Sequence, residues 1–376
     1  MNKGEKIMNA TQIYTIVNSL AEQSLGLKGL TATDASFISV GKEVLATDKN
    51  TEQFYKTLAD RIGKTVFAIR EYRNKNKALL AEGVEFGIAL QKITFDLLTA
   101  KENKTWNNTE SNPFEVFGSN VKQSIFSVMS VWEFDLTVWD RQLRTAFINA
   151  QSMGAFINGL MTAFYNSMEL AEENLGNIAK ASLIARKKDK AINLLHEYNT
   201  LTNAGLTVGK CLTDKDFLKF ASMTISMYSD RLTSMSKVFN DGSVAKHTPK
   251  KNQSLTVLND FAKACSYFME SDTYYKDLVA LPLYNVTNFW QSSGEAYAFN
   301  DISSINVDLA SDTNVTMSGI VALLADDEAV KITVQNKRIT SSYNPRGEYT
   351  NYFAKGEKGF INALDENAIV FYIAEV

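Results

Sequence analysis

The stretch Ser152–Arg186, SMGAFINGLMTAFYNSMELAEENLGNIAKASLIAR, carries the clearest structural signal in the sequence. Its apolar residues recur at spacings of three to five, which fits the α-helical period of 3.6, so we expect one rod roughly 50 Å long. Ser152 is the expected N-cap, since serine oxygen readily accepts a hydrogen bond from a free helix N–H. The apolar stripe consists of Phe156, Leu160, Phe164, Met168, Ala171, Leu175, Ile178 and Leu183.

The apolar character of this region does not predict a membrane span. Residues 145–168 carry no charged side chain, but they include several amide and hydroxyl groups that are costly in hydrocarbon. A buried amphipathic helix is therefore the better interpretation. Its basic end, Arg186, Lys187 and Lys188, suits the negative end of the helix dipole and favours a solvated face over a phosphate-binding site.

Upstream of this helix, two strand-like segments flank a polar stretch. Residues 86–93 and 121–138 have extended patterns, and the second half of the latter alternates apolar and polar side chains. Residues 99–112 between them are polar, so we expect a long two-stranded hairpin that is too thin to fold alone. Before it, Ile13–Leu25 and Thr51–Leu58 are weakly periodic and are separated by the polar Gly26–Asp48. Residues 1–60 are therefore predicted to form an arm with little core of its own.

Downstream of the helix, the pattern is first helical and then strand-like. Helices are predicted at Asp214–Phe239 and Leu255–Met269, within a mostly helical region that reaches about Asn300. Strands are predicted at Val321–Leu324, Ala329–Val334 and Ala368–Ile373. The order of elements indicates an α+β protein.

Composition is that of a folded chain with few reactive residues. The 376 residues are 45% hydrophobic and 22% charged, and the net charge of −3 argues against a strongly basic nucleic-acid binder. The two histidines, His196 and His247, are not accompanied by a nucleophile elbow or by metal-ligand spacing. Gly63-Lys64-Thr65 lacks the second glycine of a phosphate-binding loop. We expect no catalytic residues, no cofactor and no metal, and we expect Cys211 and Cys265 to be buried thiols.

Five short segments stand in a fixed order between about residues 58 and 376. They are Asp60-Arg61-Ile62-Gly63, Asn120–Phe126, Asp140–Phe147, Phe164–Ser167, and Asn344–Tyr349 with Asn351-Tyr352. In this order they resemble the major capsid proteins of tailed bacteriophages, particularly short-tailed phages of low-GC bacteria. The resemblance implies the α+β fold of the Hong Kong ninety-seven type. The implied parts are an N-terminal arm (1–61), an extended hairpin called the E-loop (62–131), a peripheral domain with a long spine helix (132–190), a mixed, helix-rich axial domain (191–321) and return strands of the peripheral domain (322–376).

Arm and hairpin residues are the predicted subunit contacts. If these parts bury little within their own subunit, their apolar residues gain burial against neighbouring subunits. Some members of the family also join subunits by a Lys–Asn isopeptide bond, but the lysines and asparagines here do not align with that motif, which favours solvated side chains. The contact candidates are Phe86, Ile88, Leu90, Lys101, Lys104, Trp106, Phe126 and Trp132.

The resemblance also implies partners and a location. Pentamers and hexamers of the chain would close an icosahedral head around packaged double-stranded DNA, which is held by non-specific contacts. A scaffolding protein and a portal would assist assembly in the cytoplasm of the bacterial host, and no membrane is involved. Two alternatives stay open: an encapsulin-like compartment that houses a cargo protein, and a monomeric helical binding protein. A hydrolytic enzyme is disfavoured by the scarcity of histidine.

Overall fold

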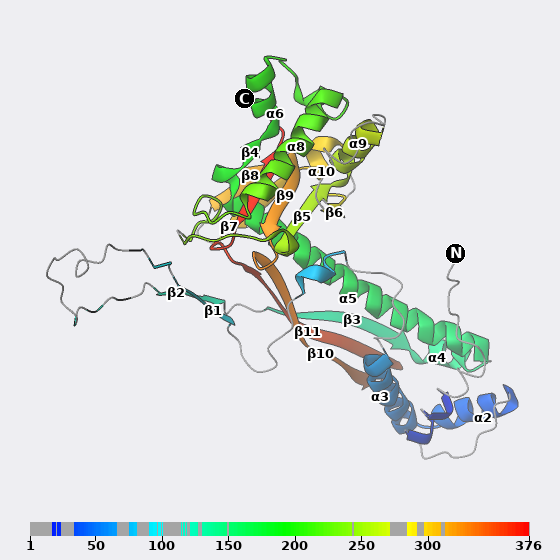
Figure 1. The fold of residues 1–376 in the computed structure, drawn as a ribbon. Coiled ribbons are helices and arrows are strands. Elements are labelled where there is room, and N and C mark those ends of the chain that lie inside the picture. The colour runs from blue at the N-terminus through cyan, green and yellow to red at the C-terminus, as the bar shows by residue number, and fades with distance from the viewer. Residues whose placement is uncertain are drawn as a thin grey trace.

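The computed structural model shows an elongated subunit with a long central helix and a projecting hairpin (Figure 1). It describes residues 17–19, 21–23, 34–65, 75–80, 90–95, 97, 98, 100, 114, 116, 118, 121–126, 130–148, 150–242, 244–270, 284–291, 297–309 and 313–375. The helices are α2 Asp34–Val44, α3 Asp48–Thr65, α4 Asp140–Ala146, α5 Ala150–Arg186, α6 Leu194–Thr202, α7 Val208–Cys211, α8 Lys215–Arg231, α9 Asn259–Glu270 and α10 Phe299–Ile302. The strands are β1 Leu90–Phe95, β2 Val121–Phe126, β3 Ser130–Trp139, β4 Ile192–Asn193, β5 Gln253–Leu258, β6 Tyr284–Thr287, β7 Ile305–Leu309, β8 Thr313–Met317, β9 Ile320–Asp326, β10 Val330–Asn344, β11 Tyr349–Asn362 and β12 Ala368–Tyr372.

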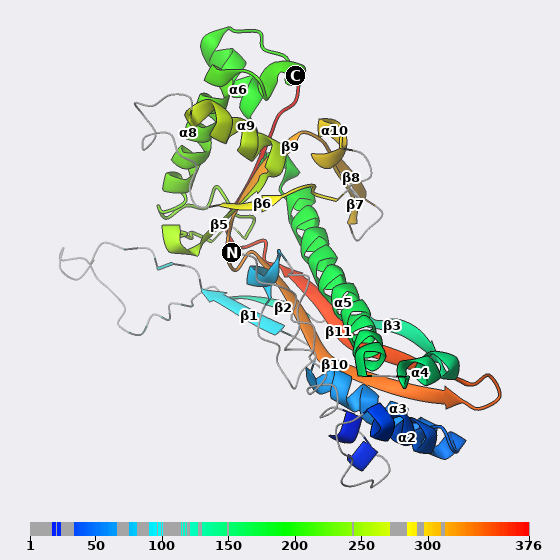
Figure 2. The same cartoon turned by 90° about the vertical axis from the view of Figure 1, so that its right-hand side faces the viewer.

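The long helix α5 packs along a three-stranded antiparallel sheet of order β10-β11-β3 (Figure 2). Helix α3 packs on the same sheet, so that Tyr352 of β11 meets two helices at once. Its ring lies edge-on to Tyr55 of α3 and to Phe164 of α5, with centroid distances of 6.1 and 6.4 Å. Such edge-to-face contacts are a favoured aromatic geometry, and all three side chains are buried. The three elements therefore share one core.

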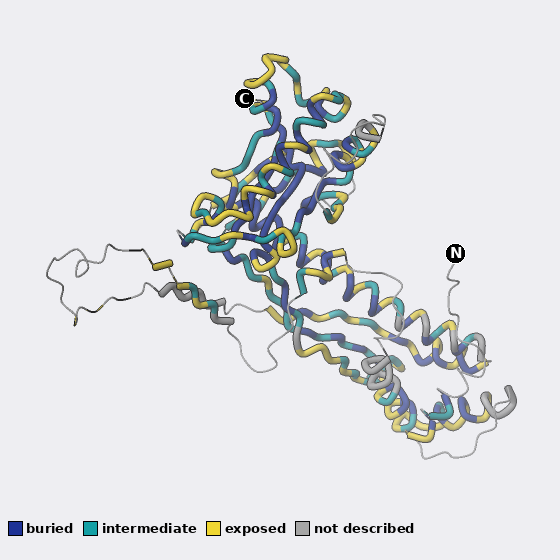
Figure 3. Tube along the Cα trace, viewed as in Figure 1, coloured by how far each residue is buried: buried dark blue, intermediate teal, exposed yellow. Residues whose placement is uncertain are grey.

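A second sheet of five strands, in the order β4-β12-β9-β5-β6, forms the other half of the subunit. The central strand β9 is buried at every position, as expected for a strand covered on both faces. Helices α6, α8 and α9 surround this sheet, and in Figure 3 the buried segments concentrate there and between α5 and the three-stranded sheet. The C-terminal half of α5, including Leu175 and Leu183, belongs to this second core. The spine helix thus ties the two sheets together.

The hairpin consists of β1 and β2, which pair in antiparallel register from Leu90 opposite Phe126 to Phe95 opposite Val121. It projects away from the two sheets (Figure 1). The expected return strand is split, because β3 leaves the hairpin and pairs with β11 along its whole length. The alternation of Trp132 to Val138 therefore belongs to the three-stranded sheet, whose one face is covered by helices.

The prediction that the N-terminal arm buries little within its own subunit is wrong for its described residues. Val40, Val44, Phe54 and Tyr55 are all buried, in one cluster with Phe147 and other residues around α4 and α5. Within the polar segment Gly26–Asp48, for which no helix was predicted, α2 occupies Asp34–Val44. The weak apolar period of this region is enough to form a helix because a partner surface on the same subunit covers it.

The spine helix is confirmed, with corrections at both ends. It begins at Ala150, so Ser152 lies in its first turn rather than before it. It ends at Arg186 as predicted, and Arg186 and Lys188 are exposed as expected. Lys187, however, is 1% exposed and pairs with Asp241, so it does not belong to a solvated face. On the predicted stripe, Ile178 is 53% exposed and Ala179 takes the buried position. The shift is confined to that turn, because Leu183 of the predicted stripe is fully buried.

Three further elements differ from the sequence prediction. The segment Leu255–Leu258 is part of strand β5, and the helix begins only at Asn259. A short apolar run does not distinguish a buried strand from a buried helix. Helix α8 ends at Arg231 rather than Phe239. Strand β12 was expected to return to the peripheral sheet, but it pairs with β4 and β9 in the five-stranded sheet.

Candidate assembly surfaces

Strand β1 separates polar and apolar side chains onto two faces. Lys92 and Thr94 reach the body of the subunit, whereas Ile93 and Phe95 are 51% and 62% exposed. This division follows from the pleat, because successive side chains of a strand point to opposite faces. One face of the hairpin therefore belongs to its own subunit, and the other offers apolar surface to solvent.

The exposed apolar surface continues outward from the strands. Leu98, Phe114 and Val116 are each at least 87% exposed. Exposed apolar residues are common singly, but a series of them on one thin projection is a mark of a protein–protein contact. The outer hairpin therefore presents an apolar surface suited to a protein–protein contact.

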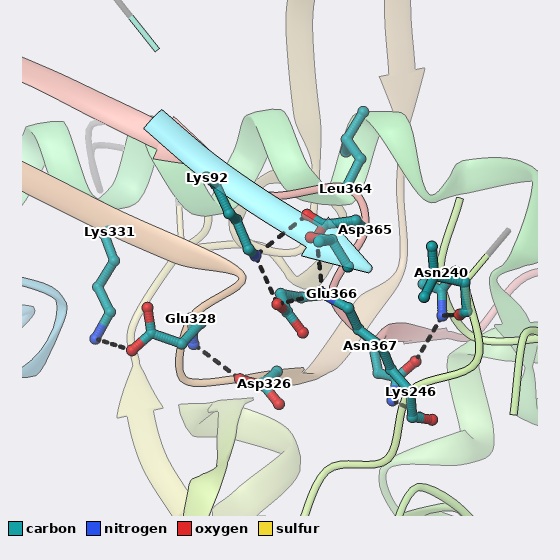
Figure 4. A network of polar contacts seen from close by, with 12 residues as sticks. Lys92, Asn240, Lys246, Asp326, Glu328, Lys331, Leu364, Asp365, Glu366 and Asn367 are labelled. Carbon is teal, nitrogen blue, oxygen red and sulfur yellow. Dashed lines mark hydrogen bonds and ion pairs between the residues drawn. The ribbon is translucent and has the colours of Figure 1, made fainter. Parts of the chain in front are cut away.

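The inner face of the hairpin rests on the turn between β11 and β12 (Figure 4). Lys92 Nζ lies 3.2 Å from Asp365 Oδ1 and 2.5 Å from Glu366 Oε1, and the Thr94 hydroxyl donates to Asp365 Oδ2 at 3.2 Å. Lys246 contacts the same two carboxylates, at 2.7 and 2.6 Å. Burial disfavours the charged form of Asp365, but hydrogen bonds and charge from Lys246 and Lys92 outweigh it and lower the pKa of that carboxyl.

The turn that carries these carboxylates is firmly held by the body. Asn367 is fully buried, and its side chain accepts from Asn240 and donates to Thr248. Backbone bonds flank it, since Asp241 N–H donates to Leu364 C=O and Ala368 N–H donates to Phe239 C=O. A Cβ atom added at Gly242 would lie 2.8 Å from Asp365 Cβ, so the chain there approaches too closely for any other residue. The turn is a rigid support for the hairpin.

An open groove, mostly apolar, lies between β3, α4 and the first turns of α5. Its lining includes Leu136, Val138, Phe156 and Leu160, with Arg141 among its polar members. Strand β3 is the last strand of its sheet, with no further strand paired to its outer edge among the described residues. An unpaired edge beside an apolar groove suits an extended segment of another chain.

Buried charged groups lie along the middle of the spine helix. Lys180 Nζ donates to Asn76 Oδ1 at 2.8 Å, and Asn76 Nδ2 donates to Glu173 C=O at 2.8 Å and to Asn177 Oδ1 at 2.9 Å. Burial lowers the pKa of Lys180 to about 8, with Glu173 acting in the opposite direction. Asn76 sits against Gly176, where a Cβ atom would be 2.6 Å from its side chain. This cluster fastens the segment 75–80 to α5.

The first residue of α4, Asp140, fastens the N-terminal helices. Its carboxylate accepts hydrogen bonds from Tyr55 of α3 at 3.3 Å and from Tyr343 of β10 at 2.9 Å. Burial and the nearby Asp140 charge raise the pKa of both tyrosines, so both hydroxyls keep their protons and donate. The buried carboxylate is thus satisfied by two elements that lie far apart in the sequence.

The residues predicted to contact neighbouring subunits do not all lie on the exposed surface of the hairpin. Phe86, Ile88, Lys101, Lys104 and Trp106 lie outside the described residues. Leu90 and Phe126 stand opposite each other in the hairpin. Trp132 is 9% exposed and stacks edge-on with Phe134 at 4.8 Å, so the expectation that it gains burial only against a neighbouring subunit is wrong. It belongs to β3, where the covered face of the sheet buries it.

Sequence reasoning missed Ile93, Phe95 and the ionic contact of Lys92. The alternation Lys92-Ile93-Thr94-Phe95 is itself a period-two signal, and it would have indicated a strand with one polar and one apolar face. The carboxylates Asp365 and Glu366 gave no such signal, because they stand more than 270 residues away in the sequence.

The histidines and cysteines lie in the described part of the chain. His196 and His247 are both exposed, and Cys211 and Cys265 are free and buried, as expected for the thiols. Within the described residues, no group of His, Cys, Asp and Glu has the geometry of a metal site. The helices in the described part of the chain are too short or too polar to cross a membrane.

A spine helix on a three-stranded sheet, a second five-stranded domain and a projecting apolar hairpin are the parts of a phage capsid fold. Two solved structures share this fold. A chain from the capsid structure of Staphylococcus phage Andhra has a TM-score of 0.50 and 10% identity, covering 82% of this chain and 86% of that chain. A chain from the structure of the head fiber and inner core protein gp22 of native bacteriophage P68 has a TM-score of 0.51, 12% identity and the same coverage. At these identities the likeness establishes the fold alone.

The sequence identifies the family. Residues 17–372 match the Phi29-like phage major capsid protein family, and the chain belongs to it. The major capsid protein of Bacillus phage GA-1 is 23% identical over 369 residues, covering 97% of this chain and 70% of that protein. The major capsid protein of Streptococcus phage Cp-1 is 25% identical over 224 residues, covering 57% and 58% of the two chains.

Membership of this family settles the class of function. The chain is a structural protein that forms the shell of a phage virion, as the resemblance implied. The relatives named above are phage capsid proteins, so the encapsulin-like compartment and the monomeric binding protein are no longer supported.

Proposed function

We propose that the chain forms pentamers and hexamers that close an icosahedral head around packaged double-stranded DNA. Assembly takes place in the cytoplasm of the bacterial host, with a scaffolding protein and a portal as partners. The net charge of −3 supports this role, because a near-neutral shell surrounds DNA without binding it tightly. In this proposal residues 1–61 are the arm and 62–131 the hairpin. Residues 132–190 form the peripheral domain together with β10 and β11, and residues 191–321 form the axial domain together with the rest of β9 and with β12.

The observation that carries the proposal is the two-faced hairpin. Its base is bound to its own subunit through Lys92, while Ile93, Phe95, Leu98 and Val116 are exposed. A monomeric protein would leave this apolar surface in water at a cost of about 25 cal/mol for each Å². A shell removes the cost by burying the same contact around every symmetry axis.

We further propose that the groove between β3, α4 and α5 receives the hairpin of an adjacent subunit. The groove is apolar through Leu136, Phe156 and Leu160, which matches the apolar outer surface of the hairpin. The free edge of β3 supplies backbone groups that pair with an extended chain. Repeating this contact from subunit to subunit closes a ring, since it is heterologous rather than two-fold.

Expression of the full chain, alone and with the scaffolding protein of its phage, tests the proposal. We expect particles of uniform diameter in electron micrographs and megadalton species in sedimentation. A single species near 41.9 kDa under both conditions would contradict assembly. Nuclease-resistant DNA in particles purified from infected cells tests the packaging role, and empty or protein-filled particles would exclude it.

A further inference from the structure

We propose that Asp365 and Glu366 form an ionic catch for Lys92. The catch sets the direction of the hairpin and determines which of its two faces points away from the subunit. The catch is a positioning device, and it goes beyond the shell-forming role of the chain. Among the described residues, the ion pairs and hydrogen bonds that join β1 to the body all end on these two carboxylates. Figure 4 shows Lys92 reaching from the strand across to the turn.

The geometry explains why the catch controls which face of the hairpin points outward as well as where the hairpin lies. Lys92 and Thr94 are two residues apart, so they lie on the same face of β1 and both contact the turn. Fixing this face to the body turns Ile93 and Phe95 outward, where they are exposed. A hairpin rotated by half a turn would instead place these two apolar side chains against the carboxylates and Lys92 against the neighbour.

The two carboxylates of the catch keep a cationic partner when the hairpin is released. Lys246 contacts both carboxylates at 2.7 and 2.6 Å, and it comes from the body rather than the hairpin. With Lys92 released, Asp365 and Glu366 therefore still have a cationic partner, so release does not leave two bare charges. Lys92 itself is 29% exposed and becomes solvated. The two carboxylates thus hold the hairpin by a contact that is strong enough to orient it and that opens without unfolding the turn.

Distances between spin labels on the hairpin and the body test the catch directly. Labels at Ala100→Cys and Leu201→Cys report the distance between the hairpin and the second domain. The native thiols Cys211 and Cys265 are buried, so the label reacts with the two introduced cysteines. In unassembled full-length subunits with intact Lys92 we expect one narrow distance distribution. Lys92→Met should broaden it at least about twofold, whereas Lys92→Arg, which keeps the cation, should not.

A matched control removes a neighbouring ion pair that does not touch the hairpin. Lys331 pairs with Glu328 at 3.6 Å in the same region (Figure 4). Lys331→Met should leave the distribution unchanged. An unchanged distribution in Lys92→Met, or equal broadening in Lys331→Met, would overturn the catch.

Particle assembly supplies a second readout, which rests on the proposed function. Lys92→Met should give particles of several diameters or open sheets, because the outward face of the hairpin is no longer fixed. The label experiment is independent of assembly, so its failure and a failure of shell formation are distinguishable. Broadened distances with uniform, closed shells would show that the catch does not guide assembly and would overturn that part of the proposal.

Discussion

At the scale of single residues, buried polar groups fasten the parts of this subunit that its apolar pattern leaves loosely specified. Asp140 joins α3 to β10 through Tyr55 and Tyr343, and Asn76 joins the segment before the hairpin to the spine helix. Both side chains are buried, and each forms hydrogen bonds with residues that are distant in the sequence. Because an unpaired buried polar group is costly, each fixes a single arrangement of its neighbours.

Tyr55→Phe should lower the free energy of unfolding of the unassembled subunit by about 1.5–3 kcal/mol, the range for hydrogen bonds to charged groups. The change leaves the buried Asp140 carboxylate with Tyr343 as its remaining side-chain donor within the described residues. Urea denaturation measures the loss. Tyr297→Phe, at a side chain that is 81% exposed, is the control and should be neutral. Equal stability of Tyr55→Phe and the parent would mean that α3 does not dock on its own subunit.

Lys180 predicts a rise of stability with pH. Burial lowers the pKa of Lys180 in the folded state from the ordinary lysine value of 10.5 to about 8. Between these two pH values the unfolded chain therefore binds more protons at this site than the folded chain does. Stability contributed at this site therefore increases as pH rises from about 8 to about 10, by an amount on the order of 2–3 kcal/mol. Comparing urea midpoints with Lys180→Met should show this increase in the parent alone. Lys210→Met, at an exposed site, should follow the parent.

At the scale of elements, sequence reasoning predicted the spine helix, but it did not predict strand β5 of the five-stranded sheet. The helix was predictable because Leu160, Phe164 and Leu175 repeat its period over many turns. Strand β5 was not, since Leu255–Leu258 is a short run, apolar except for Thr256, that is equally compatible with a helix. The arm was misjudged because its cover, Phe147 and its neighbours, comes from elements about 90 residues away. The hairpin pairing was expected, whereas its ionic support was not visible in the sequence.

Phe164→Ala tests the face of the spine helix. Phe164 is 3% exposed and packs on Tyr352, so its truncation leaves a cavity and should cost about 3–5 kcal/mol in the free energy of unfolding. Ile178→Ala on the same helix is the matched control, because that side chain is 53% exposed. We expect this control to stay within about 1 kcal/mol of the parent in thermal and urea denaturation. Similar losses in both variants would show that the buried face has been assigned wrongly.

At the scale of the whole molecule, folding and assembly use different surfaces. The two sheets and the spine helix bury their apolar residues within one chain, while Leu98 and Val116 are almost fully exposed. A change on the outer hairpin should therefore affect shells without affecting the fold. This separation is the physical basis for a subunit that is stable in solution and yet assembles, since the free energy of closure is spread over many repeated contacts.

The double substitution Leu98→Ser with Val116→Ser tests this separation. The variant should melt within about 2 °C of the parent, because side chains exposed at 88% and 91% contribute little to the fold. Its shells should fail to close, because the loss of apolar contact recurs at every copy of the interface. The matched variant Leu98→Met with Val116→Ile keeps the surface apolar and should still assemble. Sedimentation and electron microscopy of all three proteins measure the outcome. Normal particles from the serine variant would remove the outer hairpin from the assembly contact, and a large fall in its melting temperature would instead place these residues in the core of the subunit.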